Sequence, residues 1–365
     1  MSKLEVDQID PQSGTTLTLG TSGDTVVVPS GVSLAPGGGL TLTGALVVDG
    51  GTVKLDGNYP TGSNNVALGD TALDSVEAGA ERNVAIGDKA GTAITTGNNN
   101  TAIGTEALKS NTTALNNTAI GYASLCTNST GAGNTAVGQS ALCANTTASN
   151  NTAVGIESLD ANTTGASNTA LGKGSLSANT TASNNTSVGF NSLTSNTTGP
   201  SNTAVGKDAL LNNTVGDQNT AIGLSALCAN TEGGNNVAVG LNALCKNTTA
   251  TQNVAVGVYS SRDTTTGAKN TSLGYSSFRV NTTGACNVAI GNSALDANTT
   301  ASENVAVGFE SMLSNTTGSN NTAIGRCTLR ANTTAVRNTA VGAQALRDNT
   351  DGTLNTGIGV CALMK

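Results

Sequence analysis

The chain carries one pattern of apolar and polar residues that returns with a 17-residue period. Each copy opens with N-[TV]-[AS]-[VIL]-G, and its first Asn falls at 65, 83, 100, 117, 134 and so on to 355. The first interval is one residue longer than all the later ones, and there are eighteen copies, the last with Gly357 in third place. The copy at 134–150, NTAVGQSALCANTTASN, defines positions 1 to 17 of the repeat. Repetition at this scale indicates a repeat architecture rather than a globular domain.

The repeat predicts short strands and tight turns. Its length is too short for two packed helices, and Gly, Thr and Asn at fixed positions disfavour a helix. The segment T-A-V alternates as a short strand does, whereas the Gly and the two Asn of each copy tolerate positive φ and predict corners. We therefore expect an all-β fold: a β-solenoid, of the parallel β-roll or β-helix kind, with about eighteen 17-residue coils over residues 64–365. Each coil would hold two or three short strands.

Stacked coils place equal positions above one another, so every position becomes a ladder of like residues. We expect the aliphatic residue at position 4 and the Leu at position 9 to point inward and pack on their copies. The small residue at position 8 would let two walls, or two subunits, approach closely. Asn ladders at positions 1 and 12 would satisfy backbone groups at corners and each other's amides along the stack. Positions 15 to 17 vary freely. Representative ladder residues are Asn100, Gly104, Leu108, Asn111, Asn134, Gly138, Leu142 and Asn145.

Two copies depart from this pattern. The second copy has Gly91 in place of Leu and Ile94 in place of Asn. The twelfth copy has Ser261 and Thr264 at the same two positions, and the copy after it has Phe278 at the Leu position. Neutral drift within a tolerant stack accounts for such departures; a local bend, a bound ion or a receptor patch are the alternatives.

Residues 1–63 lack the 17-residue repeat. They contain TLTLG, DTVVVPSG, LTLTGALVVDG and TVKLDG, which predict short strands between Gly-rich turns. We expect a separate small β-rich element here, with its boundary to the repeats near residues 59–62.

The composition narrows the possible functions. The chain has no His, which removes the commonest general base and the commonest metal ligand, and it has no C-x-x-C pair to support a zinc site. We expect no catalytic residues, no metal and no cofactor. The net charge of −7 argues against nucleic acid or an anionic membrane as a partner, and the sequence has no apolar run long enough to predict a membrane span.

Acidic side chains at variable positions offer the one catalytic alternative. Two of them within reach of each other could act as a glycosidase pair. The candidates are Glu106, Glu157, Asp160, Asp208, Asp296 and Glu310. Pairs on adjacent coils arise by chance in a long repeat, so we favour a protein that is not an enzyme.

The seven Cys are spaced in part by the repeat length. Cys126 and Cys143 are one repeat apart, as are Cys228 and Cys245. We interpret the cysteines as small apolar residues stacked on neighbouring coils. A disulfide between stacked coils suits a strand spacing of about 4.8 Å, because Cα atoms roughly 4.4–6.8 Å apart can be bridged. A chain made in the cytoplasm would not depend on one.

With its repeat written out, the chain resembles two groups of proteins. Runs of NTAVGxxAL followed by NTTG are similar to the head repeats of trimeric autotransporter adhesins, whose shorter S-V-A-I-G-x-x-A unit forms left-handed parallel β-rolls packed as trimers. They are still more similar to repeats of phage tail fibres and other virion appendage proteins, including those of marine and cyanobacterial phages. In that group a β-rich stretch like SKLEVDQIDPQSGTTLTLGTSGDTVVVPSG commonly precedes the shaft.

This resemblance implies a structural fibre or spike protein of a bacteriophage virion, built as a rigid homotrimeric rod with intertwined or side-by-side chains. Residues 1–63 would attach to a tail or capsid component, and the rod of residues 64–365 would present a region that binds a host cell-surface glycan or protein. Assembly into the virion would take place in the host cytoplasm. Four aromatic residues directly after the Gly are candidates for sugar stacking or for a subunit interface: Tyr122, Phe190, Tyr275 and Phe309.

Two other functions stay open. One is a bacterial surface adhesin of the autotransporter style; the start MSKLEVDQIDPQ has charges and no apolar signal core, so export would need an unconventional route. The other is an ice-binding solenoid, because N-T-T ladders would make flat Thr arrays with few charges.

Overall fold

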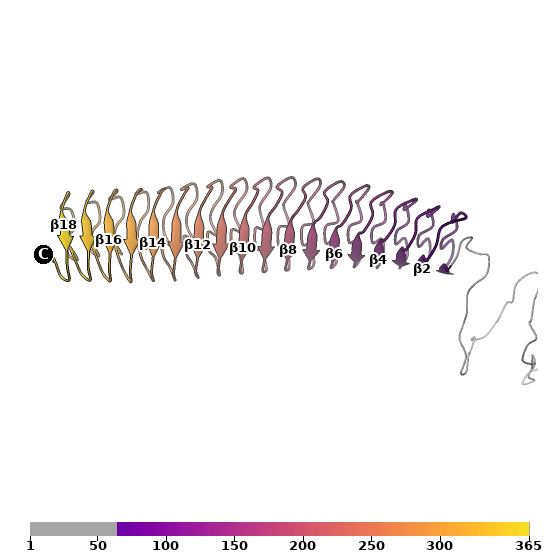
Figure 1. Ribbon diagram of the computed structural model, residues 1–365, viewed down its shortest axis with the longest axis horizontal. Coiled ribbons are helices and arrows are strands. Elements are labelled where there is room, and N and C mark those ends of the chain that lie inside the picture. The colour runs from indigo at the N-terminus through magenta and orange to yellow at the C-terminus, as the bar shows by residue number, and fades with distance from the viewer. Residues whose placement is uncertain (1–63, 365) are drawn as a thin grey trace, which may run out of the picture. The chain divides into compact units, whose positions relative to one another are not determined.

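The computed structural model describes residues 64–364, which form one single-file stack of coils (Figure 1). Each repeat contributes one three-residue strand, and turns make up most of the rest of each coil. The strands are β1 (Val66–Leu68), β2 (Val84–Ile86), β3 (Thr101–Ile103), β4 (Thr118–Ile120), β5 (Thr135–Val137), β6 (Thr152–Val154), β7 (Thr169–Leu171), β8 (Thr186–Val188), β9 (Thr203–Val205), β10 (Thr220–Ile222), β11 (Val237–Val239), β12 (Val254–Val256), β13 (Thr271–Leu273), β14 (Val288–Ile290), β15 (Val305–Val307), β16 (Thr322–Ile324), β17 (Thr339–Val341) and β18 (Thr356–Ile358). We number the coils 1 to 18 by their strands.

The strands form one parallel sheet in which each strand pairs with the next along the chain. The register is in step with the repeat, so that Ala136 in β5 lies opposite Ala153 in β6. The prediction of an all-β solenoid with one coil for each repeat is confirmed. Within residues 64–364 each coil has one strand, not two or three, and no helix is present that could cross a membrane. The predicted β-rich element of residues 1–63 lies outside the described residues.

The side of each strand that faces inward is the reverse of the predicted one. In β5 the middle residue, Ala136, is fully buried, whereas Val137 at position 4 is only partly buried. Leu171 at the same position is 38% exposed, so position 4 faces outward. Side chains alternate between the two faces of a strand, so a three-residue strand turns either its middle residue or its two flanking residues inward. The narrow interior takes the Ala and leaves the larger aliphatic side chain outside.

The turn after each strand supplies the larger side chains of the core. Leu108 and Leu142 at position 9 are fully buried, as are Ala107 and Ala141 at position 8. Position 9 therefore points inward as predicted. Burying one Leu side chain contributes about 1.5–3 kcal/mol, and each coil gains this only when a neighbouring coil covers it.

The two Asn ladders hold the coils together from inside. The backbone N–H of Asn134 donates to Oδ1 of Asn117 in the coil before (2.9 Å), and Nδ2 of Asn145 donates to Oδ1 of Asn128 (2.7 Å). Within one coil, Nδ2 of Asn134 and Nδ2 of Asn145 both donate to the carbonyl of Ala148, at 2.9 and 3.0 Å. Positions 1 and 12 are thus buried residues whose amides bond to neighbouring Asn residues and to backbone groups, as predicted for the ladders. Their φ lies outside the left-handed region, so the prediction of positive φ at these two positions is wrong.

The residue whose carbonyl receives both amides is restricted in size. Position 15 is Ala or Gly in every coil from Gly97 to Gly352, and nearly all of these residues are buried. A larger side chain there would meet the backbone carbonyl at the same position of the next coil. The expectation that all three closing positions vary freely is therefore wrong for the first of them.

The corners fall at positions 5, 7, 9 and 17, where φ is positive. Gly104 at position 5 has φ 127°, and a Cβ added to it would lie 2.6 Å from the carbonyl oxygen of Gly121. Position 9 takes the same left-handed region with a Leu, as in Leu142 with φ 54°. The left-handed conformation costs this Leu on the order of 1–2 kcal/mol, which its full burial offsets.

We expect Gly104→Ala to destabilise the stack by about 1–3 kcal/mol, because it adds a left-handed Ala and a clash with the Gly121 carbonyl. Gly79→Ala is the matched control, since Gly79 has φ 105° but nothing within 4 Å of the added Cβ. Urea unfolding followed by circular dichroism measures both. Equal losses in the two variants would mean that backbone conformation, and not the close approach of coils, explains the Gly.

In the second coil, two departures from the repeat compensate each other in the packing of the core. Gly91 stands where other coils have Leu, and Ile94 stands where they have Asn. Ile94 is 1% exposed, and a Cβ on Gly91 would lie 3.0 Å from its Cδ1 and 3.1 Å from Cδ2 of Leu73. Ile94 therefore fills the space that the Leu vacates, and the two changes form one packing unit.

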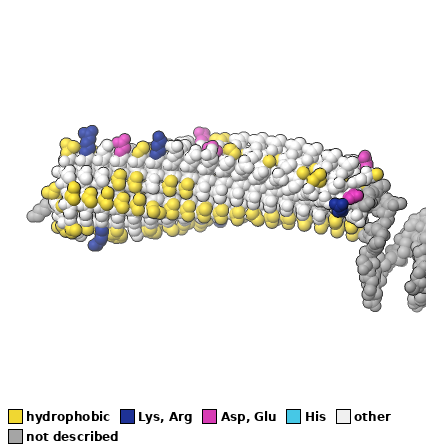
Figure 2. All heavy atoms as spheres, viewed as in Figure 1, with side chains coloured by type: hydrophobic (Ala, Val, Ile, Leu, Met, Phe, Trp, Pro, Cys, Tyr) yellow, Lys and Arg dark blue, Asp and Glu magenta, His cyan; other side chains and the backbone are white. Residues whose placement is uncertain are grey.

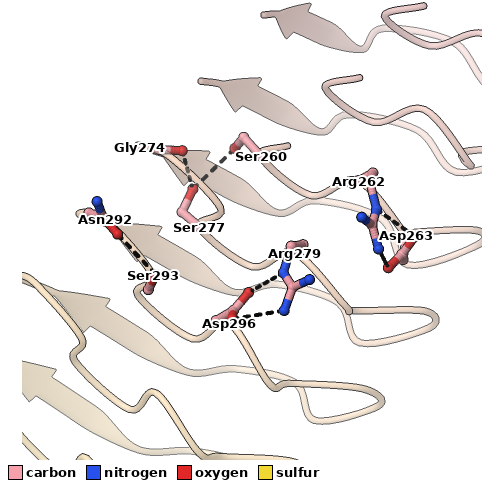
Figure 3. A network of polar contacts seen from close by, with 9 residues as sticks. All are labelled: Ser260, Arg262, Asp263, Gly274, Ser277, Arg279, Asn292, Ser293 and Asp296. Carbon is pink, nitrogen blue, oxygen red and sulfur yellow. Dashed lines mark hydrogen bonds and ion pairs between the residues drawn. The ribbon is translucent and has the colours of Figure 1, made fainter. Parts of the chain in front are cut away.

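The twelfth and thirteenth coils interrupt the apolar core. Four buried serines meet there: Oγ of Ser272 lies 2.6 Å from Oγ of Ser260 and 2.7 Å from Oγ of Ser261, and Ser277 Oγ lies 3.1 Å from Ser260 Oγ. Figure 3 shows Ser277 between Ser260 and the carbonyl of Gly274. One apolar cluster ends at Ala255 and a second begins at Phe278, whose ring is fully buried. We refer to the four serines as the serine cluster.

Candidate functional site

The outer side of the sheet carries no charged side chain. Across β1 to β18 the strands consist of Thr, Val, Ala, Ser, Ile, Leu and Gly alone. The middle residues face the core, so the residues at positions 2 and 4 together form the outer side. We call this surface the sheet face. At a spacing of about 4.8 Å per strand it is roughly 85 Å long.

Large aliphatic side chains are exposed along the whole sheet face. Leu68 and Leu273 are 47% exposed, and Ile222 is 40% exposed. The position 4 residues among the exposed large hydrophobics are Leu68, Ile86, Ile120, Leu171, Ile222, Leu273, Ile324 and Ile358. Figure 2 shows hydrophobic side chains gathered in rows along the stack. Position 2 on the same face is Thr in twelve strands and Val in six, so the aliphatic row runs beside a row that is mostly Thr. A long uncharged surface with exposed aliphatic side chains is typical of an interaction site.

The four predicted aromatic residues lie at position 6, just beyond the strand, and all are about half exposed. They sit on coils 4, 8, 13 and 15, so the structure does not bring them together. Tyr275 instead packs edge-on against Tyr259 at 6.2 Å between ring centroids, and Nζ of Lys207 lies 6.0 Å from the ring centroid of Phe190. Sequence reasoning missed Tyr259. The aromatics extend the apolar surface at separate points and form no continuous stacking platform.

The Thr residues at positions 13 and 14 have different roles. At position 13 the hydroxyl donates within the stack, as Oγ1 of Thr146 does to the carbonyl of Thr163 at 3.2 Å. At position 14 the side chain is exposed, but Val215, Glu232 and Asp351 interrupt that row. The N-T-T motif therefore exposes one row of Thr rather than the flat double array on which the ice-binding alternative depends.

Several carboxylates singled out in the sequence are paired with cations. Oε1 of Glu106 lies 3.0 Å from Nζ of Lys109, and Oε2 of Glu310 lies 2.7 Å from Nε of Arg330. Figure 3 shows the two bonds between Arg279 and Asp296, which join coils 13 and 14, with Nε to Oδ1 at 2.9 Å. Burial raises the pKa of Asp160. The ion pairs lie on the surface, where a single pair contributes up to about 1 kcal/mol.

The cysteines do not all behave as buried apolar residues. Cys327 is buried, Cys286 and Cys361 are exposed, and the other four are partly exposed. Within residues 64–364 no group of three or more Cys, Asp or Glu side chains could hold a metal ion.

No protein-family model matches the chain, and no curated protein matches it in sequence. The sheet face is the candidate site on physical grounds, because it is uncharged over all eighteen strands and carries exposed aliphatic side chains along its length.

Proposed function

We propose that this chain is a structural fibre or spike protein of a bacteriophage virion, in which three copies associate along the sheet face to make a rigid rod. The observation that carries the proposal is the uncharged outer side of an eighteen-strand sheet, with exposed Leu and Ile along its length. Water contact with such a surface is unfavourable, and a second copy has the same surface at the same spacing.

The number of copies and the virion assignment rest on the resemblance of the NTAVGxxAL repeats to phage fibres and to trimeric adhesin heads. Three identical faces that meet around one axis close on themselves and leave no open interface for further growth. Residues 1–63 would attach the rod to a tail or capsid component. The outward turns of the rod would carry the contact with a host-surface glycan or protein.

The first experiment is the light-scattering mass of the purified full chain, with negative-stain images of the same peak. We expect three times the chain mass of 35.7 kDa, with straight rods in the images. A mass of 35.7 kDa at all concentrations would contradict self-association through the sheet face.

A second experiment tests the virion assignment separately. We expect mass spectrometry of purified phage particles to detect peptides of this chain, and immunogold labelling to place it on an appendage. Absence from purified particles, together with detection on bacterial cells that carry no phage, would favour a surface adhesin instead.

A further inference from the structure

Four of the seven cysteines lie at position 10, in two pairs on adjacent coils. Cys126 and Cys143 belong to coils 4 and 5, and Cys228 and Cys245 belong to coils 10 and 11. All four are free and partly exposed, so small reagents in solution can reach them.

The backbone holds each pair in register. The N–H of Thr127 donates to the carbonyl of Cys143 at 3.2 Å, and the N–H of Ala229 donates to the carbonyl of Cys245 at 3.0 Å. The residues before them are joined in the same way, as Leu227 N–H is to the Ala243 carbonyl at 3.0 Å. Such pairing keeps neighbouring Cα atoms about 4.8 Å apart, inside the range of roughly 4.4–6.8 Å that a disulfide spans.

In each pair the Sγ atom of the first cysteine contacts the second cysteine. Sγ of Cys228 lies 2.7 Å from Sγ of Cys245, and Sγ of Cys126 donates to the carbonyl of Cys143 at 3.5 Å. The remaining cysteines offer a contrast within the same chain. Cys327 and Cys361 share position 7 but are two coils apart, roughly 9.6 Å, which is too far for a disulfide.

We propose that Cys228–Cys245 and Cys126–Cys143 are sites of disulfide formation between adjacent coils, made by exchange with a small-molecule disulfide such as oxidised glutathione. This modification joins coils within one chain and does not depend on the proposed function.

Oxidised glutathione is the oxidant in the formation of each disulfide. The Cys245 thiolate attacks one glutathione sulfur, the glutathione S–S bond breaks, and one glutathione leaves as a thiolate that takes up a proton. Cys228 then loses its proton to solvent and attacks the Cys245 sulfur of the mixed disulfide, which expels the second glutathione. The two cysteine sulfurs are oxidised by two electrons, and oxidised glutathione is reduced to two thiols.

Charges around the second pair favour the attacking thiolate. The hydrogen bond from Cys228 lowers the pKa of Cys245 to about 7, with help from Lys246 and Arg262, while burial and Asp263 oppose it. A group with a lowered pKa is ionised over a wider pH range, so exchange at Cys245 rises with pH and levels off above about 7.

The charged groups around the first pair are less favourable for a thiolate at Cys143. The hydrogen bond from Cys126 likewise lowers the pKa of Cys143 to about 7, but burial and the carboxylates of Asp160 and Glu106 oppose it. The pKa of the attacking thiol is lowered to about 7 in both pairs, so the pKa does not rank them. We expect Cys228–Cys245 to form before Cys126–Cys143 when the two compete for the same oxidant, because the Sγ atoms of Cys228 and Cys245 already lie 2.7 Å apart.

Trypsin separates the two pairs for analysis. The peptide 110–173 contains only Cys126 and Cys143, and the peptide 208–246 contains only Cys228 and Cys245. The folded full chain is incubated with oxidised glutathione, its remaining thiols are alkylated, and the digest is weighed by mass spectrometry. We expect both peptides to lose their two alkylation sites and gain no glutathione, while the peptides with Cys286, Cys327 and Cys361 form no disulfide with one another.

Variants and the unfolded chain complete the test. Cys228→Ser should leave Cys245 as a stable mixed disulfide with glutathione, whereas Cys286→Ser should change nothing in either pair. The proposal is overturned if both thiols of each pair are alkylated, or if each cysteine carries its own glutathione. It is also overturned if the disulfides join peptides of different chains, or if they form no faster in the folded chain than in denaturant.

Discussion

Glutamate at Leu171, Ile222 and Leu273 is expected to convert the proposed assembly of three chains into a monomer of 35.7 kDa. These three residues lie at position 4 of β7, β10 and β13, and each is more than a third exposed on the sheet face. In the single chain their replacement meets water and costs little. In an assembly each copy would bring three carboxylates into an apolar interface without cations, and burying an unpaired charge there costs several kcal/mol.

The control places the same charges on another side of the coil. Thr181, Thr249 and Thr300 are exposed residues at position 14, where the chain already has Glu232 and Asp351. We expect the triple Glu variant of these threonines to keep the mass of the parent. Far-ultraviolet circular dichroism checks that both variants retain the parent's β-structure. If the sheet-face variant keeps the full mass, the copies associate through another surface.

Phe278→Ala is expected to cost about 3–5 kcal/mol of stability, because it opens a cavity in the core. The ring is fully buried at position 9 of coil 13, where most other coils have Leu. Its neighbour in coil 12 is Ser261, so no large apolar side chain stands on that side to fill the cavity. Hydrogen exchange followed by mass spectrometry should show loss of protection in coils 12 to 14 first.

The matched control is Phe309→Ala. This ring is 45% exposed at position 6, so its removal leaves no cavity and should change the unfolding midpoint little. Equal destabilisation by the two variants would mean that Phe309 is covered in solution, which would point to a subunit contact at position 6.

The stack itself could be predicted from the sequence because every repeat carries the same spacing of Asn, Gly and Leu. Which residues of the strand face the core could not be predicted from apolarity alone, since both Ala136 and Val137 are apolar. Residue size is the better signal. Position 3 is held to Ala, Ser or Gly, as a cramped interior requires, whereas position 4 varies among Val, Ile and Leu, as an outer surface permits.

The amide ladders of Asn134 and Asn145 could be predicted from the repeat, but the backbone conformation of these two residues could not. Asn is common at positive φ in turns, so local propensity favoured a left-handed conformation. Both residues lie outside that region, and their amides join the coils as a ladder requires. Ala148, the residue they share, could have been found from the absence of any larger side chain at its position. The cysteine pairs were visible from their spacing of one repeat, whereas the charges that distinguish them depend on which side chains the coils place beside each thiol.

The serine cluster has a consequence for where the stack of coils would separate on unfolding. Coils of a solenoid transmit cooperativity only through contact with their neighbours, and the apolar contact ends at Ala255 and resumes at Phe278. The first apolar cluster extends to coil 12 through Ala255, and the second extends from coil 13 through Phe278, so the serine cluster separates two apolar cores. A break at the serine cluster would divide the described coils into a shorter segment and a longer one, each with its own apolar core.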